Sequence, residues 1–192
     1  MIRLGILASG RGTAFFPIQE AISQQKLAAK IEIIISNKPD APIIFRAKKL
    51  DLEAQVIDYK GKSPEECDRQ LSDLLKKHHV DLIILIGFMR ILSEEFVTLW
   101  QNKIINIHPS LLPLHAGKMD LAVHQAVLDA KEKISGCTVH YVTPMVDAGP
   151  IVLQKQCIVE ENDTAETLKA RVQQLEGEAL IAAIKKINLT KK

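Results

Sequence analysis

Asn106 and His108 stand two positions apart in the string Asn-Ile-His-Pro-Ser, at the end of an apolar run typical of a β-strand. In extended backbone, side chains two positions apart point to the same side, so this amide and imidazole would face one site. An amide donor beside an imidazole suits stabilisation of an oxyanion, and histidine is best suited to moving protons near neutral pH. A lone histidine is more often structural than catalytic. The pairing with Asn106, and the rigid backbone that Pro109 and Pro113 give to the segment after the strand, favour a catalytic role.

A candidate partner for this histidine is Asp147, which lies in a turn-like run before the last predicted strand. As a partner, the carboxylate would orient His108 and support its charged form. A turn aspartate also commonly caps its own backbone. Separation along the chain does not decide between the two interpretations.

A second chemical feature is the glycine-rich stretch 9–14, Ser-Gly-Arg-Gly-Thr-Ala, between the first predicted strand and helix. Gly10 and Gly12 permit a tight turn, and the free N–H groups at the start of the helix favour a phosphate. A dinucleotide site would need a glycine at Phe15 and an acidic residue after the second strand, where 36–38 is Ser-Asn-Lys. The stretch is therefore either a phosphate site of another kind or a plain strand–helix turn.

The elements that must position these residues alternate between short β-branched runs and helical stretches. Predicted strands cover residues 4–8, 31–36, 54–57, 82–86, 103–107, 137–142 and 151–156. Predicted helices cover 17–25, 41–50 and 120–130, and others begin at the capping signals Ser63, Ser93 and Asp163. The alternation predicts an α/β fold in one domain, 1–192: a Rossmann-like, doubly wound, mostly parallel sheet with helices on both faces. Such sheets bind ligands beyond the carboxyl ends of their strands.

Composition narrows the class of protein. The chain of 192 residues is 47% hydrophobic and 25% charged with a net charge of +2, typical of a soluble globular protein. It has no basic stripe and only 4% aromatic residues, which argues against a nucleic-acid partner. Short apolar runs and the absence of a signal sequence predict no membrane association and a cytoplasmic location. The widely spaced Cys67, Cys137 and Cys157 predict buried thiols, and no motif predicts a metal.

Three strings resemble signature blocks of the formyltetrahydrofolate-using formyltransferases. They are Asn-Ile-His-Pro-Ser-Leu-Leu-Pro at 106–113, Gly-Phe-Met-Arg-Ile-Leu at 87–92 and Val-Asp-Ala-Gly-Pro-Ile-Val-Leu-Gln at 146–154, in the family's order. The strings at 7–13 and 36–41 resemble the branch that acts on glycinamide ribonucleotide. The resemblance covers nearly the whole chain and implies the formyltransferase fold.

The resemblance implies transfer of the formyl group of 10-formyltetrahydrofolate, a co-substrate, to the amine of glycinamide ribonucleotide in purine biosynthesis. It implies an N-terminal half that holds the ribonucleotide phosphate, a C-terminal half that holds the folate, and no metal. It leaves open a monomer or a homodimer. Two alternatives remain: a formyltetrahydrofolate hydrolase, with water in place of the amine, and a non-catalytic sugar-phosphate binding module, which has no reason to pair Asn106 with His108.

The resemblance also implies residue roles. Asn106, His108 and Asp147 match the catalytic trio, in which Asn106 and a protonated His108 donate to the tetrahedral oxyanion. The positions that match ribonucleotide-binding residues are Gly12, Thr13, Ala14, Met89, Pro109, Gln173 and Glu176. The positions that match folate-binding residues are Met89, Arg90, Ile91, Leu92, Val142, Thr143 and Met145.

Two departures from the family pattern matter. Ala14 stands where many members have asparagine, which removes one side-chain contact but leaves a backbone contact to phosphate. The stretch 114–125 differs from the better-known version of the family, so no site residue is assigned to His115, Lys118 or Asp120.

Overall fold

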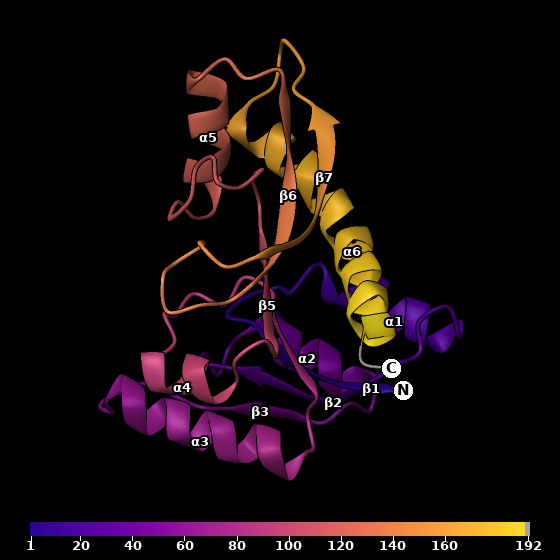
Figure 1. The fold of residues 1–192 in the computed structure, drawn as a ribbon, viewed down its shortest axis with the longest axis vertical. Coiled ribbons are helices and arrows are strands. Elements are labelled where there is room, and N and C mark those ends of the chain that lie inside the picture. Colours follow the sequence, from indigo (N-terminus) through magenta and orange to yellow (C-terminus); the bar gives the residue numbers. More distant parts are fainter. Residues whose placement is uncertain (191–192) are drawn as a thin grey trace.

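Seven strands form one sheet in the order β3-β2-β1-β4-β5-β6-β7 in the computed structural model, which describes residues 1–190 (Figure 1). The strands are β1 (Ile2–Leu7), β2 (Ala29–Ser36), β3 (Ala54–Val56), β4 (Leu82–Leu85), β5 (Ile104–His108), β6 (Ile134–Tyr141) and β7 (Ile151–Ile158). Neighbours from β3 to β5 pair in parallel, whereas β6 pairs antiparallel with both β5 and β7. The loops that follow β1, β2, β4 and β5 therefore meet at one edge of the sheet.

Helices cover both faces of this sheet. They are α1 (Phe15–Ser23), α2 (Pro42–Lys49), α3 (Pro64–Lys77), α4 (Glu94–Leu99), α5 (Leu121–Asp129) and α6 (Ala165–Thr190). Along β4, Ile84 packs in a core with α1, α2 and α6, whereas its neighbour Ile83 packs in a second core with α3 and α4. The predicted α/β class, with a doubly wound and mostly parallel sheet, is confirmed.

Two of the predicted helix starts are confirmed in detail, and one is displaced. Ser63 and Ser93 each accept a hydrogen bond from the backbone N–H three residues on, at 3.1 and 3.2 Å. The start of α6 lies one residue later than predicted, because Thr164 accepts the corresponding N–H at 3.3 Å. Asp163 instead pairs with Arg171, which lies two turns along the helix.

The cysteines are free thiols, and two of the three are buried as predicted. Cys67 and Cys137 are buried, but the prediction is wrong for Cys157, which is half-buried. Cys157 lies on β7, an edge strand whose alternate residues are open to solvent. Among residues 1–190, no helix is long and apolar enough to cross a membrane.

Candidate active site

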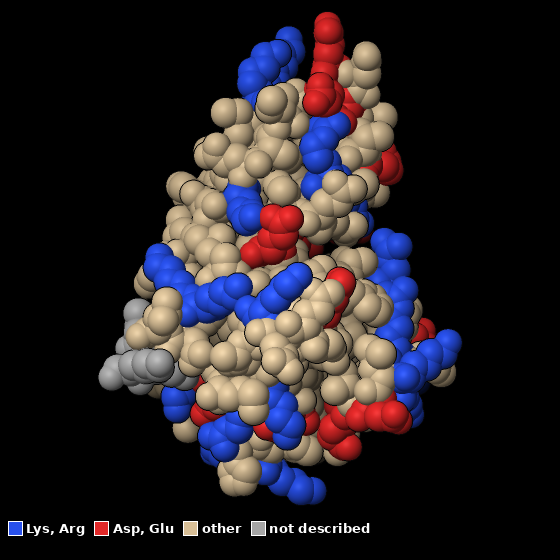
Figure 2. All heavy atoms as spheres, turned by 90° about the vertical axis from the view of Figure 1, so that its right-hand side faces the viewer, with Lys and Arg blue, Asp and Glu red and all other residues tan. Residues whose placement is uncertain are grey.

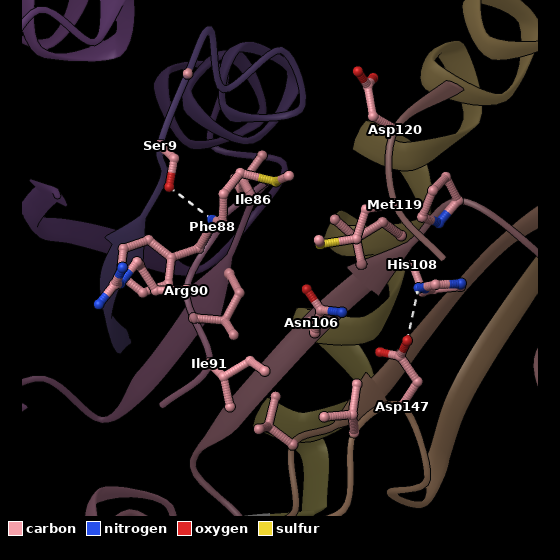
Figure 3. A pocket seen from close by; sticks show the side chains of 18 of the residues that line it. Ser9, Ile86, Phe88, Arg90, Ile91, Asn106, His108, Met119, Asp120 and Asp147 are labelled. Carbon is pink, nitrogen blue, oxygen red and sulfur yellow. Dashed lines mark hydrogen bonds and ion pairs between the residues drawn. The ribbon is translucent and has the colours of Figure 1, made fainter. Parts of the chain in front are cut away.

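A cavity of about 570 Å³ lies beyond the carboxyl ends of the parallel strands, where α/β sheets of this type bind ligands (Figure 3). Its walls come from the loops after β1, β4, β5 and β6, from α6 and from the segment 117–120. The predicted site residues that line it are Gly12, Thr13, Met89, Arg90, Ile91, Leu92, Asn106, His108, Pro109, Val142, Thr143, Asp147, Gln173 and Glu176.

Two predicted site residues do not line the cavity. The side chain of Ala14 is buried in the core beneath α1, so this residue can offer only its backbone to a ligand. Met145 lies at the tip of the loop between β6 and β7, and 72% of its surface is exposed. The side chain of Met145 therefore faces solvent in this structure.

The predicted trio comes together at the centre of the cavity. Asn106 and His108 lie on the same side of β5, and Asp147 reaches them from the loop between β6 and β7 (Figure 3). His108 Nδ1 lies 3.3 Å from Asp147 Oδ2; His108 is buried and Asp147 is half-buried. Because a carboxylate only accepts hydrogen bonds, this contact favours a hydrogen on Nδ1.

Asp147 is held by its own backbone and by a neighbouring loop. Its φ of +52° lies in the left-handed region, which aspartate tolerates better than most residues. The backbone N–H of Gly117 donates to Asp147 Oδ2 at 2.9 Å. The carboxylate therefore contacts His108 and accepts from Gly117, a residue of another loop, as expected of a partner of the histidine rather than of a side chain that caps its own turn.

His140 is a member of this cluster that the sequence did not reveal. It lies on β6 directly opposite Asn106. Its Nδ1 is 3.0 Å from the carbonyl of Tyr141, which places the hydrogen on Nδ1 and leaves Nε2 of the neutral ring as an acceptor. Asn106 Nδ2 donates to that Nε2 at 3.2 Å, and Asp147 Oδ1 lies 3.6 Å from it. The ring therefore orients the amide of Asn106.

Burial sets the protonation of this cluster. It lowers the pKa of His108, against the opposing effect of Asp147 and of the backbone at His115. It also lowers the pKa of His140. His108 Nε2 is buried and has no hydrogen-bond partner among the described residues. Burial therefore favours the neutral form of both rings, whereas the family resemblance implies a charged His108.

The loop after β1 is shaped for close backbone approach. Gly12 has a φ of +59°, and a Cβ there would lie 2.4 Å from Ile43 Cδ1, so only glycine fits. Helix α2 holds this loop from behind: the N–H of Ile43 donates to the carbonyl of Gly10 at 3.3 Å. Arg46 Nη1 donates to the carbonyl of Arg11 at 3.0 Å. Residues 9–13 of this loop line the cavity directly before the amino end of α1.

Helix α6 approaches the same loop closely. A Cβ on Gly177 would lie 2.4 Å from Pro17 Cγ in the first turn of α1, so glycine permits this contact. Gln173 and Glu176, in the turn before, line the cavity. Glu176 is almost fully buried, and burial raises its pKa to about 7. Its carboxyl group is thus partly protonated at neutral pH.

An apolar wall faces this polar half of the cavity. The segment 87–92 leaves β4 with Gly87 at a φ of +58° and exposes 45% of Met89 and 77% of Ile91. The guanidinium of Arg90 lies over the ring of Tyr59, 4.6 Å from its centroid. The loop that carries Val142 forms the opposite side. A flat aromatic ligand fits such a slot.

The segment 117–120 contributes residues that the sequence analysis did not assign. Lys118, Met119 and Asp120 line the cavity, and Asp120 forms an ion pair with Lys169 on α6. Figure 2 shows Lys, Arg, Asp and Glu side chains interspersed over one face of the molecule. Within the described part of the chain, no group of three His, Cys, Asp or Glu residues is placed to hold a metal ion.

Comparison with known proteins gives matches along nearly the whole chain. The formyl transferase family matches residues 2–184. Phosphoribosylglycinamide formyltransferase of Haemophilus influenzae is 38% identical over 186 residues, covering 96% of this chain and 86% of that protein. Trifunctional purine biosynthetic protein adenosine-3 of Gallus gallus is 39% identical over 184 residues, but this chain spans only 18% of its length. The crystal structure of glycinamide ribonucleotide transformylase 1 from Symbiobacterium toebii superposes with a TM-score of 0.91, at 37% identity, covering 96% of this chain and 86% of that one.

Proposed function

The chain belongs to the formyl transferase family, and on this premise we propose that it transfers the formyl group of 10-formyltetrahydrofolate to the amine of glycinamide ribonucleotide. The observation that carries the proposal is one cavity lined by the glycine-rich loop after β1, by the segment 87–92 and by the cluster of Asn106, His108 and Asp147. The loop suits the phosphate of the ribonucleotide, the apolar segment suits the pterin ring of the folate, and the cluster suits the formyl group between them. The relative from Haemophilus influenzae, of which this chain covers 86%, carries the corresponding name.

The ribonucleotide is assigned to the side of the cavity formed by the loop after β1 and by α6. The phosphate accepts hydrogen bonds from the backbone N–H groups at Gly12, Thr13 and Ala14, at the positive end of α1. Gln173 and Glu176 face the ribose. A partly protonated Glu176 both donates and accepts, as does a sugar hydroxyl. Met89 and Pro109 line the junction where the amine meets the folate, a role assigned from their place in the cavity wall.

The folate is assigned to the apolar slot. The backbone of Arg90, Ile91 and Leu92 offers hydrogen bonds to the edge of the pterin, and Val142 and Thr143 close the opposite side. No metal has a role in this scheme, because the donors that the oxyanion needs are side chains.

The chemistry takes place between the two ligands. The amine nitrogen attacks the formyl carbon, a new C–N bond forms, and the carbonyl electrons move onto the oxygen. Asn106 Nδ2 donates to that oxyanion, the Nδ1–H of His108 is shared between the oxyanion and Asp147, and Asp147 and His140 orient these two donors. The carbonyl then re-forms, the bond to the folate nitrogen breaks, and the proton lost by the amine passes to that nitrogen. We place this proton transfer at Asp147, which contacts both imidazoles.

The proposal also includes the cellular location of the protein and its oligomeric state. The substrates belong to purine biosynthesis, which places the protein in the cytoplasm. The residues assigned to both ligands come from one chain, so either a monomer or a homodimer suffices for activity.

The test is turnover of 10-formyltetrahydrofolate with and without glycinamide ribonucleotide, followed by absorbance of the released tetrahydrofolate. We expect turnover only with the ribonucleotide, and its loss in His108→Ala but not in His78→Ala, which lies outside the cavity. Turnover without the ribonucleotide would make the protein a hydrolase, which has no use for the loop after β1. A folded protein that binds ribose 5-phosphate without any turnover would instead be a binding module.

A further inference from the structure

Ser9 joins three of the loops that surround the cavity. It follows β1, is only 4% exposed, and lines the cavity wall. Its hydroxyl donates to Asn37 Oδ1, after β2, at 2.6 Å. It accepts from the backbone N–H of Met89, after β4, at 2.7 Å (Figure 3). One small side chain thus uses both its donor and its acceptor to connect segments that are distant in sequence.

The connection lies between the two proposed ligand sites. Ser9 begins the loop assigned to the phosphate, and Met89 begins the edge assigned to the folate. The backbone N–H of Ser9 also donates to the carbonyl of Gly87 at 3.1 Å, so the two segments are tied at two points. One of these bonds is made by the backbone and survives any substitution of Ser9 other than proline, whereas the other needs the hydroxyl.

We propose that Ser9 is a positioning residue for formyl transfer. Its hydroxyl holds the loop assigned to the phosphate (9–14) in a fixed position relative to the segment assigned to the folate (87–92). The inference rests on the proposed function. Transfer between two bound ligands needs the amine within about 3–3.5 Å of the formyl carbon, and small errors of placement reduce the rate strongly. Each ligand keeps its own contacts without the Ser9 hydroxyl, but their relative placement is then less well fixed.

Ser72 offers a matched control. It is also 4% exposed, and its hydroxyl accepts from Trp100 Nε1 at 3.0 Å, in the core between α3 and α4 and outside the cavity. Ser72→Ala and Ser9→Ala therefore each remove a buried, hydrogen-bonded hydroxyl. Both should lower the melting temperature, since Ser72→Ala leaves the buried Trp100 Nε1–H and Ser9→Ala the partly buried N–H of Met89 without its partner.

The experiment compares kcat, both KM values and the melting temperature in wild type, Ser9→Ala, Ser72→Ala, Asn37→Ala and the double variant Ser9→Ala/Asn37→Ala. We expect Ser9→Ala to lower kcat about tenfold while each KM changes less than about threefold. Ser72→Ala should keep the wild-type kcat. Asn37→Ala should lower kcat less than Ser9→Ala does, and the double variant should be no slower than Ser9→Ala, because the two residues act through one hydrogen-bonded unit.

Three results would overturn the inference: a kcat within twofold of wild type in Ser9→Ala, an equal loss in Ser72→Ala, or fully additive losses in the double variant. If Ser9→Ala does not fold, the inference is tested with Asn37→Ala instead. An unchanged kcat in Asn37→Ala also overturns the inference. A wild-type protein that folds but does not transfer formyl groups refutes the proposed function itself, and the inference with it. Active wild type with an unaffected Ser9→Ala refutes only the role of Ser9.

Discussion

Asp147→Asn separates the catalytic interpretation of this residue from the purely structural one. Asparagine has the same shape, caps a turn equally well and tolerates the φ of +52°. It also keeps an oxygen that can accept from the N–H of Gly117. What it removes is the negative charge 3.3 Å from His108 Nδ1 and 3.6 Å from His140 Nε2. A residue needed only for the turn would lose nothing.

The expected loss is large. A ring N–H is held about twice as strongly by an ionised carboxylate as by a neutral amide oxygen, so asparagine would orient His108 less firmly. Asp147 also raises the pKa of His108, so its removal disfavours any positive charge that the ring develops. Losing the orientation of one oxyanion donor typically costs about 10²–10³ in rate. We therefore expect kcat to fall about 100- to 1000-fold.

The assay is formyl transfer at saturating concentrations of both substrates, with the melting temperature measured in parallel. Asp163→Asn is the control, because Asp163 also forms an ion pair but lies outside the cavity. It should keep the wild-type kcat although it loses stability. A kcat for Asp147→Asn within threefold of wild type would refute the catalytic interpretation and leave Asp147 as a turn residue.

Three further predictions follow from single contacts. Gly12→Ala should raise the KM for the ribonucleotide at least tenfold, because the new Cβ would collide with the side chain of Ile43. The double variant Gly12→Ala/Ile43→Ala should recover part of the affinity. A double variant with the same KM as Gly12→Ala would contradict this steric explanation. His140→Phe should lower kcat about tenfold or more with little change in either KM, since it removes the acceptor that orients Asn106. Glu176 has a pKa raised to about 7, so the folded protein binds its proton more tightly than the unfolded chain does, and stability falls as the pH rises from about 4.5 to 7. Glu176→Gln should remove that fall and be more stable than wild type at pH 8 by up to about 3 kcal/mol in urea unfolding; equal pH dependence in both proteins would contradict it.

Local sequence was sufficient for much of the fold. The N-caps at Ser63 and Ser93 depend on contacts three residues apart, and the buried run of β4 depends only on its own composition. The alternation along β5 was enough to place Asn106 and His108 on one side. These features need no knowledge of the rest of the chain, which is why the sequence predicted them.

The features that were missed depend on pairing between distant segments. His140 meets Asn106 because β6 runs antiparallel to β5 in one particular register, and a register shifted by one residue would turn its ring to the other face. Ser9 meets Met89 across 80 positions of the chain. Lys169 and Asp120 pair across the cavity rim although neither lies in a recognisable motif. Sequence spacing carries no information on such contacts.

The protonation of His108 can be decided by the pH dependence of kcat. The sequence favoured a charged ring, whereas burial lowers its pKa below the usual 6.5. If the neutral ring is active and donates through Nδ1, kcat should rise with pH through this lowered pKa and stay level above it. If the charged ring is required, kcat should instead fall as the pH rises through the same value. Measuring kcat at saturating substrates between about pH 5 and 8 distinguishes the two directions, and Asp147→Asn should move the midpoint lower because the supporting charge is gone. We expect kcat to rise with pH. The one carboxylate near the buried ring, Asp147, is shared with His140, and its stabilisation of a charged His108 does not offset the desolvation of the ring. A kcat that falls as the pH rises would refute the mechanism in which a neutral His108 is the donor.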